Sequence, residues 1–204
     1  MTESRFDRAI RRFREISAQD PERTLDGGQE RPRELVASER LIRWLERVQP
    51  AASESLRLAA HCQHIGRYAT PRSTYPEGRI GYLKWRSDLA KAHAARAAEI
   101  LLDAGYDSGT VDAVRAINLK QGLRTNPEVQ SMEDALCLSF LEHEFPDFAE
   151  KHDDQKLIEI VAKTWRKMSP PARELAMGLA MSGRPRELVE RALAGTTQEV
   201  SSDD

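Results

Sequence analysis

A group of polar side chains occurs where the helical periodicity of the sequence otherwise places apolar residues. Its members are Gln63, His64, His93, Glu133 and Asp134. Because residues three or four positions apart share a helix face, both histidines and at least one of the adjacent carboxylates should point toward a packed side or into a cleft. A buried carboxylate without a partner costs several kcal/mol, so such groups are usually paired with one another or with a metal ion.

Neutral imidazoles and carboxylate oxygens are suitable ligands for a divalent metal ion, and helical bundles often hold such sites in their cores. We therefore predict a divalent metal ion bound by His64, His93 and Asp134. Glu133 and Asp134 are the candidate catalytic acids. The ion would polarise a phosphoryl oxygen and lower the pKa of its bound water to about 7. The alternative is that each histidine is an ordinary core hydrogen-bond partner, since the spacing matches no fixed metal-ligand motif.

The segment 67–96, here called the basic arm, combines cations with aromatic rings. Its acids are Glu77 and Asp88 alone. Planar guanidinium groups suit bidentate contacts with phosphate or carboxylate, and aromatic rings can stack on a base. We therefore expect an anionic small molecule, such as a nucleotide or another phosphate ester, to be bound by Gln63, Arg67, Arg72, Tyr75, Arg79, Lys84, Trp85 and Arg86. The alternative is that the arginines tie the loop to acidic helix faces while the rings pack beneath them.

The elements that must position these residues are predicted to be helices. Capping residues, stop signals and apolar stripes indicate an all-α fold of about nine helices, in a single compact domain over residues 1–194. A disordered acidic tail is expected at 195–204. Gly27 and Gly28 should break the chain, and Pro32 should open the second helix. No stretch alternates apolar and polar residues with β-branched enrichment, so strands are not expected.

Composition limits the function classes. The 204 residues carry a formal net charge of -2, which argues against a general DNA-coating protein, although local patches can still bind polyanions. Two cysteines are too few for a disulfide framework and fit free thiols in a reducing compartment. Neither a signal-peptide core nor an apolar run of membrane-spanning length occurs. We therefore expect a soluble, cytoplasmic protein without a membrane partner.

Several motifs point to a family. The stretch LAAHCQHIGRYATPRSTYPEGRIGYLKWRSDL, residues 58–89, contains QHI-x-R-aromatic, PR-x-x-YP and R-x-GYL-x-WR, and H-A follows at His93. Further on, the chain reads EDALCLSFLE and KTWRKMS. These patterns resemble an uncharacterised family of small bacterial and fungal proteins that is catalogued only as a domain of unknown function. The resemblance covers nearly the whole chain except the tail, with Tyr68, Met132 and Asn126 where Trp, Leu and Asp are usual, and it implies no activity.

A second resemblance bears on mechanism. LAAHCQHIGR is similar to the LAALLHDIGK-type stretch of HD-domain phosphohydrolases, which are all-helical and metal-dependent. KAHAARAAEIL resembles their next histidine-bearing helix, and EDALCLSFLE the helix with their final aspartate. The chain departs from this pattern because Gln63 and His64 stand where the His-Asp dyad should be, and the preceding helix SERLIRWLERV has no histidine. The resemblance implies an HD-like fold with a mononuclear site, a rearranged site, or an inactive site that only binds its ligand.

Two function hypotheses follow from these observations. The first is metal-assisted hydrolysis of a phosphate ester, with the arginines of the basic arm holding the phosphate. The second is a non-catalytic binding or accessory module for an anionic ligand, an RNA or a protein partner. In the second hypothesis the histidines and acids form a structural polar network.

Overall fold

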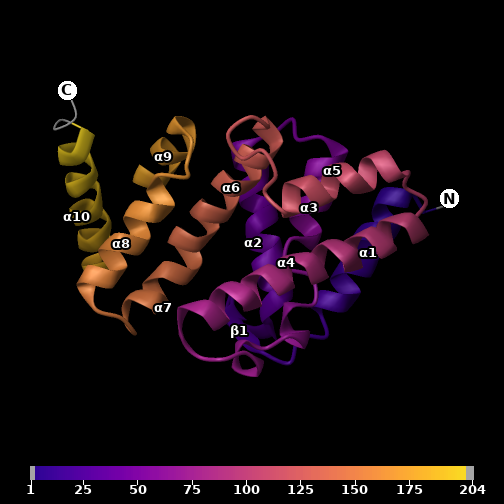
Figure 1. The fold of residues 1–204 in the computed structure, drawn as a ribbon, viewed down its shortest axis with the longest axis horizontal. Helices are drawn as coiled ribbons and strands as arrows, with labels where there is room; N and C mark the ends of the chain where they lie inside the picture. The colour runs from indigo at the N-terminus through magenta and orange to yellow at the C-terminus, as the bar shows by residue number, and fades with distance from the viewer. Residues whose placement is uncertain (1–2, 201–204) are drawn as a thin grey trace. The chain divides into compact units, whose positions relative to one another are not determined.

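The computed structural model describes residues 3–200, with side chains described over 3–194, and most of these residues are helical (Figure 1). Several helices begin at residues that cap them. Ser4, Ser53 and Asp107 each accept a backbone N–H bond from the first turn of the helix that follows. The predicted all-α class is confirmed, with one short hairpin as an exception. The chain divides into two compact units, Met1–Met132 and Glu133–Asp204.

The first unit contains most of the predicted site residues. It begins with α1 (Arg5–Ser17), β1 (Arg23–Asp26), β2 (Gln29–Pro32) and α2 (Arg33–Val48). Then follow α3 (Glu54–Cys62), two short 3₁₀ turns (Arg67–Ala69 and Arg72–Thr74), the long α4 (Gly78–Asp103) and α5 (Ser108–Asn118). Helix α6 (Pro127–Ser139) begins in this unit and continues into the second.

Helix α3 lies at the centre of the first unit and packs against α1, α2 and α5. Leu56, Leu58 and Ala59 are completely buried. Burial of a leucine side chain stabilises a fold by about 1.5–3 kcal/mol, so this short helix is held firmly by its apolar residues. The polar residues directly after α3 are therefore positioned by the core of the unit.

The expectation that the chain has no strands is wrong at residues 23–32. Strands β1 and β2 form an antiparallel hairpin in which Asp26 pairs with Gln29. Gly27 and Gly28 connect them with φ angles of +59° and +81°, the conformation of the two-residue turns that favour hairpins. The strands were missed because they are short and strongly charged, with little apolar and polar alternation. The two glycines do not merely break the chain; they reverse it.

The described residues of the second unit form helices joined by short turns and loops. After α6 the chain passes through one π-helical turn (Phe140–Glu144) into α7 (Phe145–Ala149), α8 (Asp154–Trp165), α9 (Pro170–Met177) and α10 (Gly183–Val200). Phe145, Leu157 and Leu188 are at the centre of its core. Helix α10 includes residues 195–200 of the segment predicted to be a disordered tail, and residues 201–204 lie outside the described residues.

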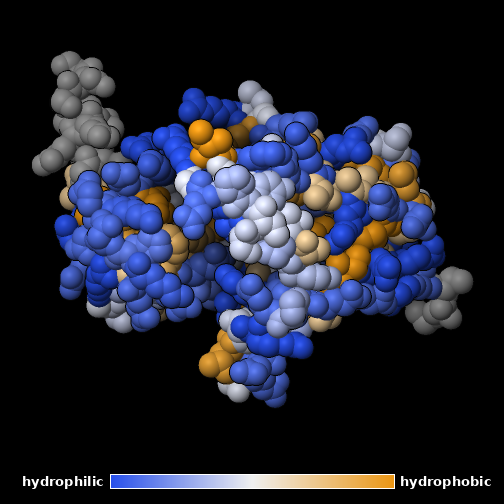
Figure 2. All heavy atoms as spheres, turned by 60° about the horizontal axis from the view of Figure 1, so that its bottom comes forward, coloured by the Kyte–Doolittle hydropathy of each residue, from blue (hydrophilic) through white to orange (hydrophobic). Residues whose placement is uncertain are grey.

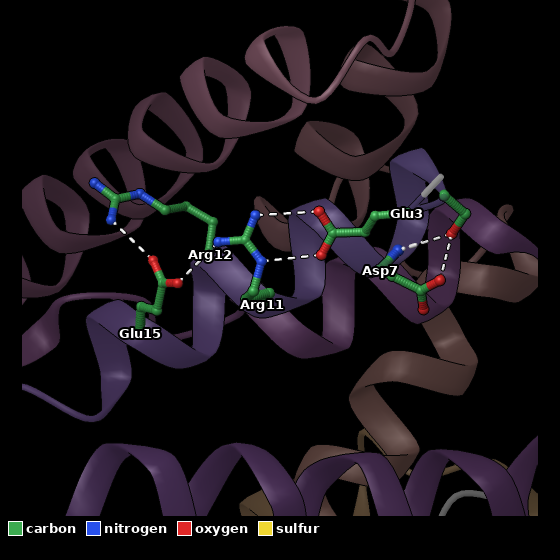
Figure 3. A network of polar contacts seen from close by, with 6 residues as sticks. Glu3, Asp7, Arg11, Arg12 and Glu15 are labelled. Carbon is green, nitrogen blue, oxygen red and sulfur yellow. Dashed lines mark hydrogen bonds and ion pairs between the residues drawn. The ribbon is translucent and has the colours of Figure 1, made fainter. Parts of the chain in front are cut away.

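The molecular surface is largely hydrophilic, and Figure 2 shows hydrophobic residues as small separate patches on the face that it draws. On α1, Arg11 makes ion pairs of 2.9 Å with both Glu3 and Glu15, and Arg12 joins Glu15 at 3.1 Å (Figure 3). Such exposed pairs are screened by water and contribute little stability. Among the described helices, none has the length and apolar character needed to cross a bilayer.

Candidate functional site

Helix α3 ends at Cys62, and a tight turn follows that carries several of the predicted site residues. Within it, Gly66 has a φ of +68°, a conformation that residues with a side chain rarely adopt. A Cβ atom at this position would also collide with the guanidinium of Arg96 on α4. The backbone angle therefore favours glycine at this position, whereas the flexible end of Arg96 could move aside for a side chain.

The structure brings the two predicted histidines together. His93 is 5% exposed, and its Nδ1 lies 2.8 Å from the backbone oxygen of Ile65. Because a carbonyl oxygen only accepts, Nδ1 must donate, which leaves Nε2 of the neutral ring as an acceptor. The rings of His64 and His93 meet edge to face with their centroids 6.3 Å apart. One imidazole edge with a defined acceptor nitrogen thus lies beside a second imidazole.

Both histidines are surrounded by positive charge. The pKa of His64 is lowered to about 3. Burial is the main cause, and the nearby charges of Arg67, His93, Lys120 and Arg86 act in the same direction. Burial also lowers the pKa of His93 to about 4, while its bond to Ile65 acts in the opposite direction. Both rings are therefore neutral at pH 7. The charged side chains with the main effects on the pKa of His64 all lower it, so these cations contribute a positive potential at this ring.

Lys120 was not predicted as a site residue. It follows α5 and has a φ of +57°. Among the described residues, every other residue with a positive φ is a glycine. A bulky residue in the left-handed region costs about 1–2 kcal/mol, and such strain tends to occur at functional positions. Its charge acts on His64 across a long separation in sequence. Neither the unusual backbone angle nor this proximity can be recognised from a lysine in a loop.

Several residues of the basic arm stabilise the arm itself. Arg72 donates to the backbone oxygens of Tyr75 and Pro76 at 2.9 and 2.8 Å, which closes the loop before α4. The indole N–H of Trp85, a buried residue, donates to the Thr70 carbonyl at 2.9 Å. These contacts hold the loop together, but Arg72 binds backbone oxygens of the loop and not the acidic helix faces that the alternative supposed.

The Asp88 carboxylate neutralises one predicted ligand-binding cation. It accepts bonds from Lys84 Nζ at 2.6 Å and from the Tyr75 hydroxyl at 3.1 Å. These two bonds hold the pKa of Asp88 below its ordinary value. Lys84 and Tyr75 therefore already have an anionic partner inside the arm.

Three arginines of the arm, Arg67, Arg79 and Arg86, are exposed at the surface of the unit. The Arg67 guanidinium lies 5.0 Å from the Trp85 ring centroid, and that of Arg86 lies 5.9 Å from the Tyr82 ring. Of these three, Arg67 and Arg86 are the ones whose charge acts on His64. They define the side of the arm that is suited to an anion.

Glu34 is a buried acid that sequence reasoning missed. It lies in the first turn of α2 and is 6% exposed. Its Oε1 accepts a bond from the Ser17 hydroxyl at 2.9 Å and another from the backbone N–H of Gly66 at 2.6 Å. Burial raises the pKa of Glu34 above its ordinary value. An acid in the first turn of a helix is commonplace, so nothing in the sequence distinguished Glu34 as the residue that holds the turn after α3.

Gln63 lies beside this acid. The Oε1 of Gln63 and the Oε2 of Glu34 are buried and accept no hydrogen bond from any described residue. Both residues line a cavity of about 10 Å³, together with Ser17, Ser38 and His64. That volume is about enough for one water molecule. Gln63 therefore belongs to a buried polar cluster that extends from Glu34 to His64.

The predicted catalytic acids belong to the second unit, where each has a partner. Asp134 Oδ1 accepts the backbone N–H of Ser169 at 2.8 Å, and Oδ2 accepts its hydroxyl at 2.6 Å. Ser169 is the N-cap of α9, so Asp134 fixes the start of that helix. Glu133 is 2% exposed, with Lys167 Nζ 3.5 Å from its Oε1.

No group of three or more His, Cys, Asp or Glu side chains is arranged to hold a metal ion within the part of the chain that the structure describes. The predicted ion at His64, His93 and Asp134 stays a prediction, and so does the catalytic role of Glu133.

Comparison with known proteins identifies a family but no activity. A family model described as "Domain of unknown function (DUF4202)" matches residues 7–189. No curated protein and no solved structure matches the chain. The likeness to HD-domain phosphohydrolases therefore stays a prediction from the sequence motifs.

Proposed function

The chain belongs to the family described as domain of unknown function DUF4202, and because that description assigns no activity, we propose from the geometry of the first unit that it binds an anionic small molecule bearing a phosphate group. The ligand is held beside His64 and His93, at the side of the basic arm that presents Arg67 and Arg86.

One observation carries this proposal: the imidazoles of His64 and His93 meet edge to face with their centroids 6.3 Å apart, and the charged side chains with the main effects on the pKa of His64 are cations. Three of those cations are Arg67, Arg86 and Lys120. A positive potential over a partly buried site favours an anion, and a low local dielectric strengthens the attraction. A phosphate ester suits this charge better than a monocarboxylate, because guanidinium groups bind phosphate oxygens bidentately.

The two neutral histidines would contribute directional hydrogen bonds to the ligand and no charge. His93 offers Nε2 as an acceptor, which matches a ligand hydroxyl or a protonated phosphate oxygen. His64 is neutral at pH 7 and can donate one N–H to an anionic oxygen. A bound anion would stabilise the imidazolium form, so it should raise the pKa of His64 from its low value.

Isothermal titration calorimetry of the full chain with inorganic phosphate and with phenylphosphonate, which cannot be hydrolysed as an ester, tests this proposal. Arg67→Gln or Arg86→Gln should weaken binding at least tenfold, about 1.4 kcal/mol, and added salt should weaken it further. Lys91→Gln is the matched control, since Lys91 is an exposed cation of α4 whose charge does not act on His64. Equal loss in this control would mean that the binding is only nonspecific attraction.

Lys120→Gly separates ligand binding from folding. Glycine accepts the positive φ of this position without strain, so the free energy of unfolding should change by less than about 1 kcal/mol. The loss of the charge should nevertheless reduce phosphonate affinity several-fold. If the wild-type chain binds RNA but neither small probe at millimolar concentration, the small-molecule proposal is wrong.

Metal-assisted hydrolysis of a phosphate ester is a second candidate, and the ring of His93 favours it. Histidines that bind metal through Nε2 usually donate Nδ1–H to a carbonyl or a carboxylate, as His93 does to Ile65. His64 would be the second ligand of this unit. The cations around His64 oppose a divalent ion, which is why anion binding is the first proposal.

Elemental analysis of the purified chain, combined with a phosphatase screen under Mn²⁺, Mg²⁺, Ni²⁺ and Fe²⁺, distinguishes the two candidates. Hydrolysis predicts bound metal near one equivalent and its loss in His93→Gln. Phosphonate binding without metal and without turnover would leave the anion-binding module alone.

A further inference from the structure

A second and larger cavity lies in the first unit, between α1, α2 and α3. It has a volume of about 170 Å³. Leu45 and Ala60 are almost completely buried and form its floor, while Glu46 and Arg57 are exposed at its rim. The cavity therefore opens to the surface of the unit, and two of its residues, Ala60 and His61, also line the small cavity beside Glu34.

The walls of this cavity are mainly apolar. Phe6, Ile42, Leu45 and Pro50 are among the apolar residues that line it, and the polar part of the lining consists of Glu46, Gln49, Arg57 and His61. An engineered apolar cavity of about 150 Å³ is known to hold benzene, so this volume suits one six-membered ring or a short branched chain. Ligand sites typically combine such walls with a few convergent polar groups.

The polar groups gather at one end. The ring of His61 meets that of Phe6 edge to face with a centroid separation of 6.3 Å. The Arg57 guanidinium lies 5.0 Å from the same Phe6 ring. The imidazole of His61 makes no hydrogen bond to another described residue, so its nitrogens are available to a molecule in the cavity.

The charge at this end is positive. The pKa of His61 is lowered to about 4. Burial is the main cause, and the charges of Arg14 and Arg57 act in the same direction. The ring is therefore neutral at pH 7 and can donate one N–H. Arg14 is paired with Glu39, whereas Arg57 has the Phe6 ring as its partner and no ion pair among the described residues.

We propose that this cavity binds a small apolar monocarboxylate, with its ring or branched chain against Phe6, Leu45 and Ala60 and its carboxylate between Arg57 and His61. Ala60 and His61 also line the small cavity that contains His64, but the carboxylate would bind Arg57 and not Arg67 or Arg86, so this proposal does not depend on the proposed function. The carboxylate would receive one charged and one neutral hydrogen bond, while the apolar body fills space that the side chains leave open.

Benzoate is a suitable probe, and benzylamine and benzamide share its ring but not its charge. In two-dimensional NMR of the full chain, benzoate at millimolar concentration should shift the signals of Phe6, Ala60 and His61. Its affinity should exceed that of benzylamine at least tenfold. Binding should also raise the pKa of His61 above about 4, since a carboxylate stabilises the imidazolium.

Two variants and a control complete the test. Arg57→Gln should reduce benzoate affinity at least tenfold, and Ala60→Leu should abolish binding by filling the floor of the cavity. If Ala60→Leu strongly lowers the melting temperature, Ala52→Leu replaces it as the cavity-filling variant, because Ala52 lines the same cavity and is less buried. Arg43→Gln, an exposed cation of α2 outside the lining, should bind benzoate like the wild type.

The outcomes separate this site from the anion site. Arg67→Gln should leave benzoate binding unchanged, and phosphate should not displace benzoate. The proposal is overturned if benzylamine binds as tightly as benzoate, if Arg57→Gln binds normally, or if no lining signal shifts. Each of these results can occur whether or not phosphate binds beside His64.

Discussion

His93 illustrates how one buried residue can serve both the fold and a site. Its Nδ1–H is used by the Ile65 carbonyl, which stabilises the turn after α3. The same bond determines that Nε2 is the nitrogen left for a ligand. The structural and functional interpretations of this histidine are therefore compatible. A variant that loses stability would not by itself exclude a role in binding.

The position of His93 on a buried helix face follows from its spacing in the sequence, whereas the charges around it do not. Arg67 and Lys120 come from different segments, and only the folded chain brings their charges to bear on His64. Glu34 is a similar case, because its partners Ser17 and Gly66 lie 17 and 32 residues away in sequence. Local patterns predict which residues are buried, but they carry little information about such long-range partners.

Glu34 leads to a prediction about pH. Its folded-state pKa is raised above the unfolded value, so its contribution to stability is fully present below the unfolded value of 4.5 and is lost as the pH rises through the folded value. Glutamine stays neutral and can still accept the bonds from Ser17 and Gly66. Glu34→Gln should therefore gain stability relative to the wild type between pH 4.5 and pH 8, as measured by urea denaturation.

The control for this measurement is Glu30→Gln, an exposed acid of β2 without an ion pair among the described residues. Its stability difference from the wild type should be flat over the same pH range. A Glu34→Gln variant with an equally flat difference would show that the carboxyl of Glu34 is not destabilised by burial.

At the scale of elements, helix termini explain much of what the polar residues do. Asp134 and Ser169 belong to α6 and to the start of α9, and their two hydrogen bonds join these elements within the second unit. Pro170 and Pro171 follow the cap, where proline suits the first helical turn. The motif KTWRKMS thus ends in a capping serine that has a buried acid as its partner.

This pairing predicts a stability effect for Asp134. Asp134→Ala should lower the free energy of unfolding by about 1–3 kcal/mol, because the N–H and hydroxyl of Ser169 lose their acceptor. A double-mutant cycle with Ser169→Ala should give a coupling energy of at least about 0.5 kcal/mol. Asp147→Ala, an exposed acid of α7, is the control and should be nearly neutral. Zero coupling would mean that the hydroxyl bond between Ser169 and Asp134 adds no stability.

Most elements were predictable because their signals are local. Ser4 and Ser53 cap α1 and α3, and Pro127 opens α6, as such residues do at helix starts. The hairpin of β1 and β2 was not predicted, although Gly27 and Gly28 are a known turn signal, because charged four-residue strands give no periodicity. The loop before α4 contains two short 3₁₀ turns that depend on the bonds of Arg72 to backbone oxygens. Such bonds leave no local pattern.

At the scale of the molecule, the division at Met132 and Glu133 could not be read from composition. The boundary falls inside α6, with no linker rich in glycine, proline or serine to indicate it. The predicted site residues are distributed over both units. His64, His93 and the basic arm belong to the first, and Glu133 and Asp134 to the second. The sequence indicated the residue types of a site but not which of them form one cluster.

The first unit holds three histidines with lowered pKa values, and this predicts its response to acid. The pKa values are about 4 for His61, about 3 for His64 and about 4 for His93, against 6.5 for an ordinary histidine. A group with a lowered folded-state pKa contributes stability above its unfolded value, and that stability is lost as the pH falls toward the folded value. The first unit should therefore weaken progressively between pH 6.5 and pH 4.

This loss of stability can be measured by urea denaturation, with hydrogen exchange of the backbone amides in α3 and α4 as the signal that reports on the first unit. Between pH 7 and pH 4.5 the unfolding free energy of the first unit should fall by more than about 2 kcal/mol, even though protonation of Glu34 acts in the opposite direction. His93→Gln should reduce the slope, because its side chain stays neutral in both states. Phenylphosphonate should also reduce the slope if it binds beside His64, since it would raise that pKa toward the unfolded value. An unchanged slope in His93→Gln would mean that His93 takes up its proton without opposition from its burial.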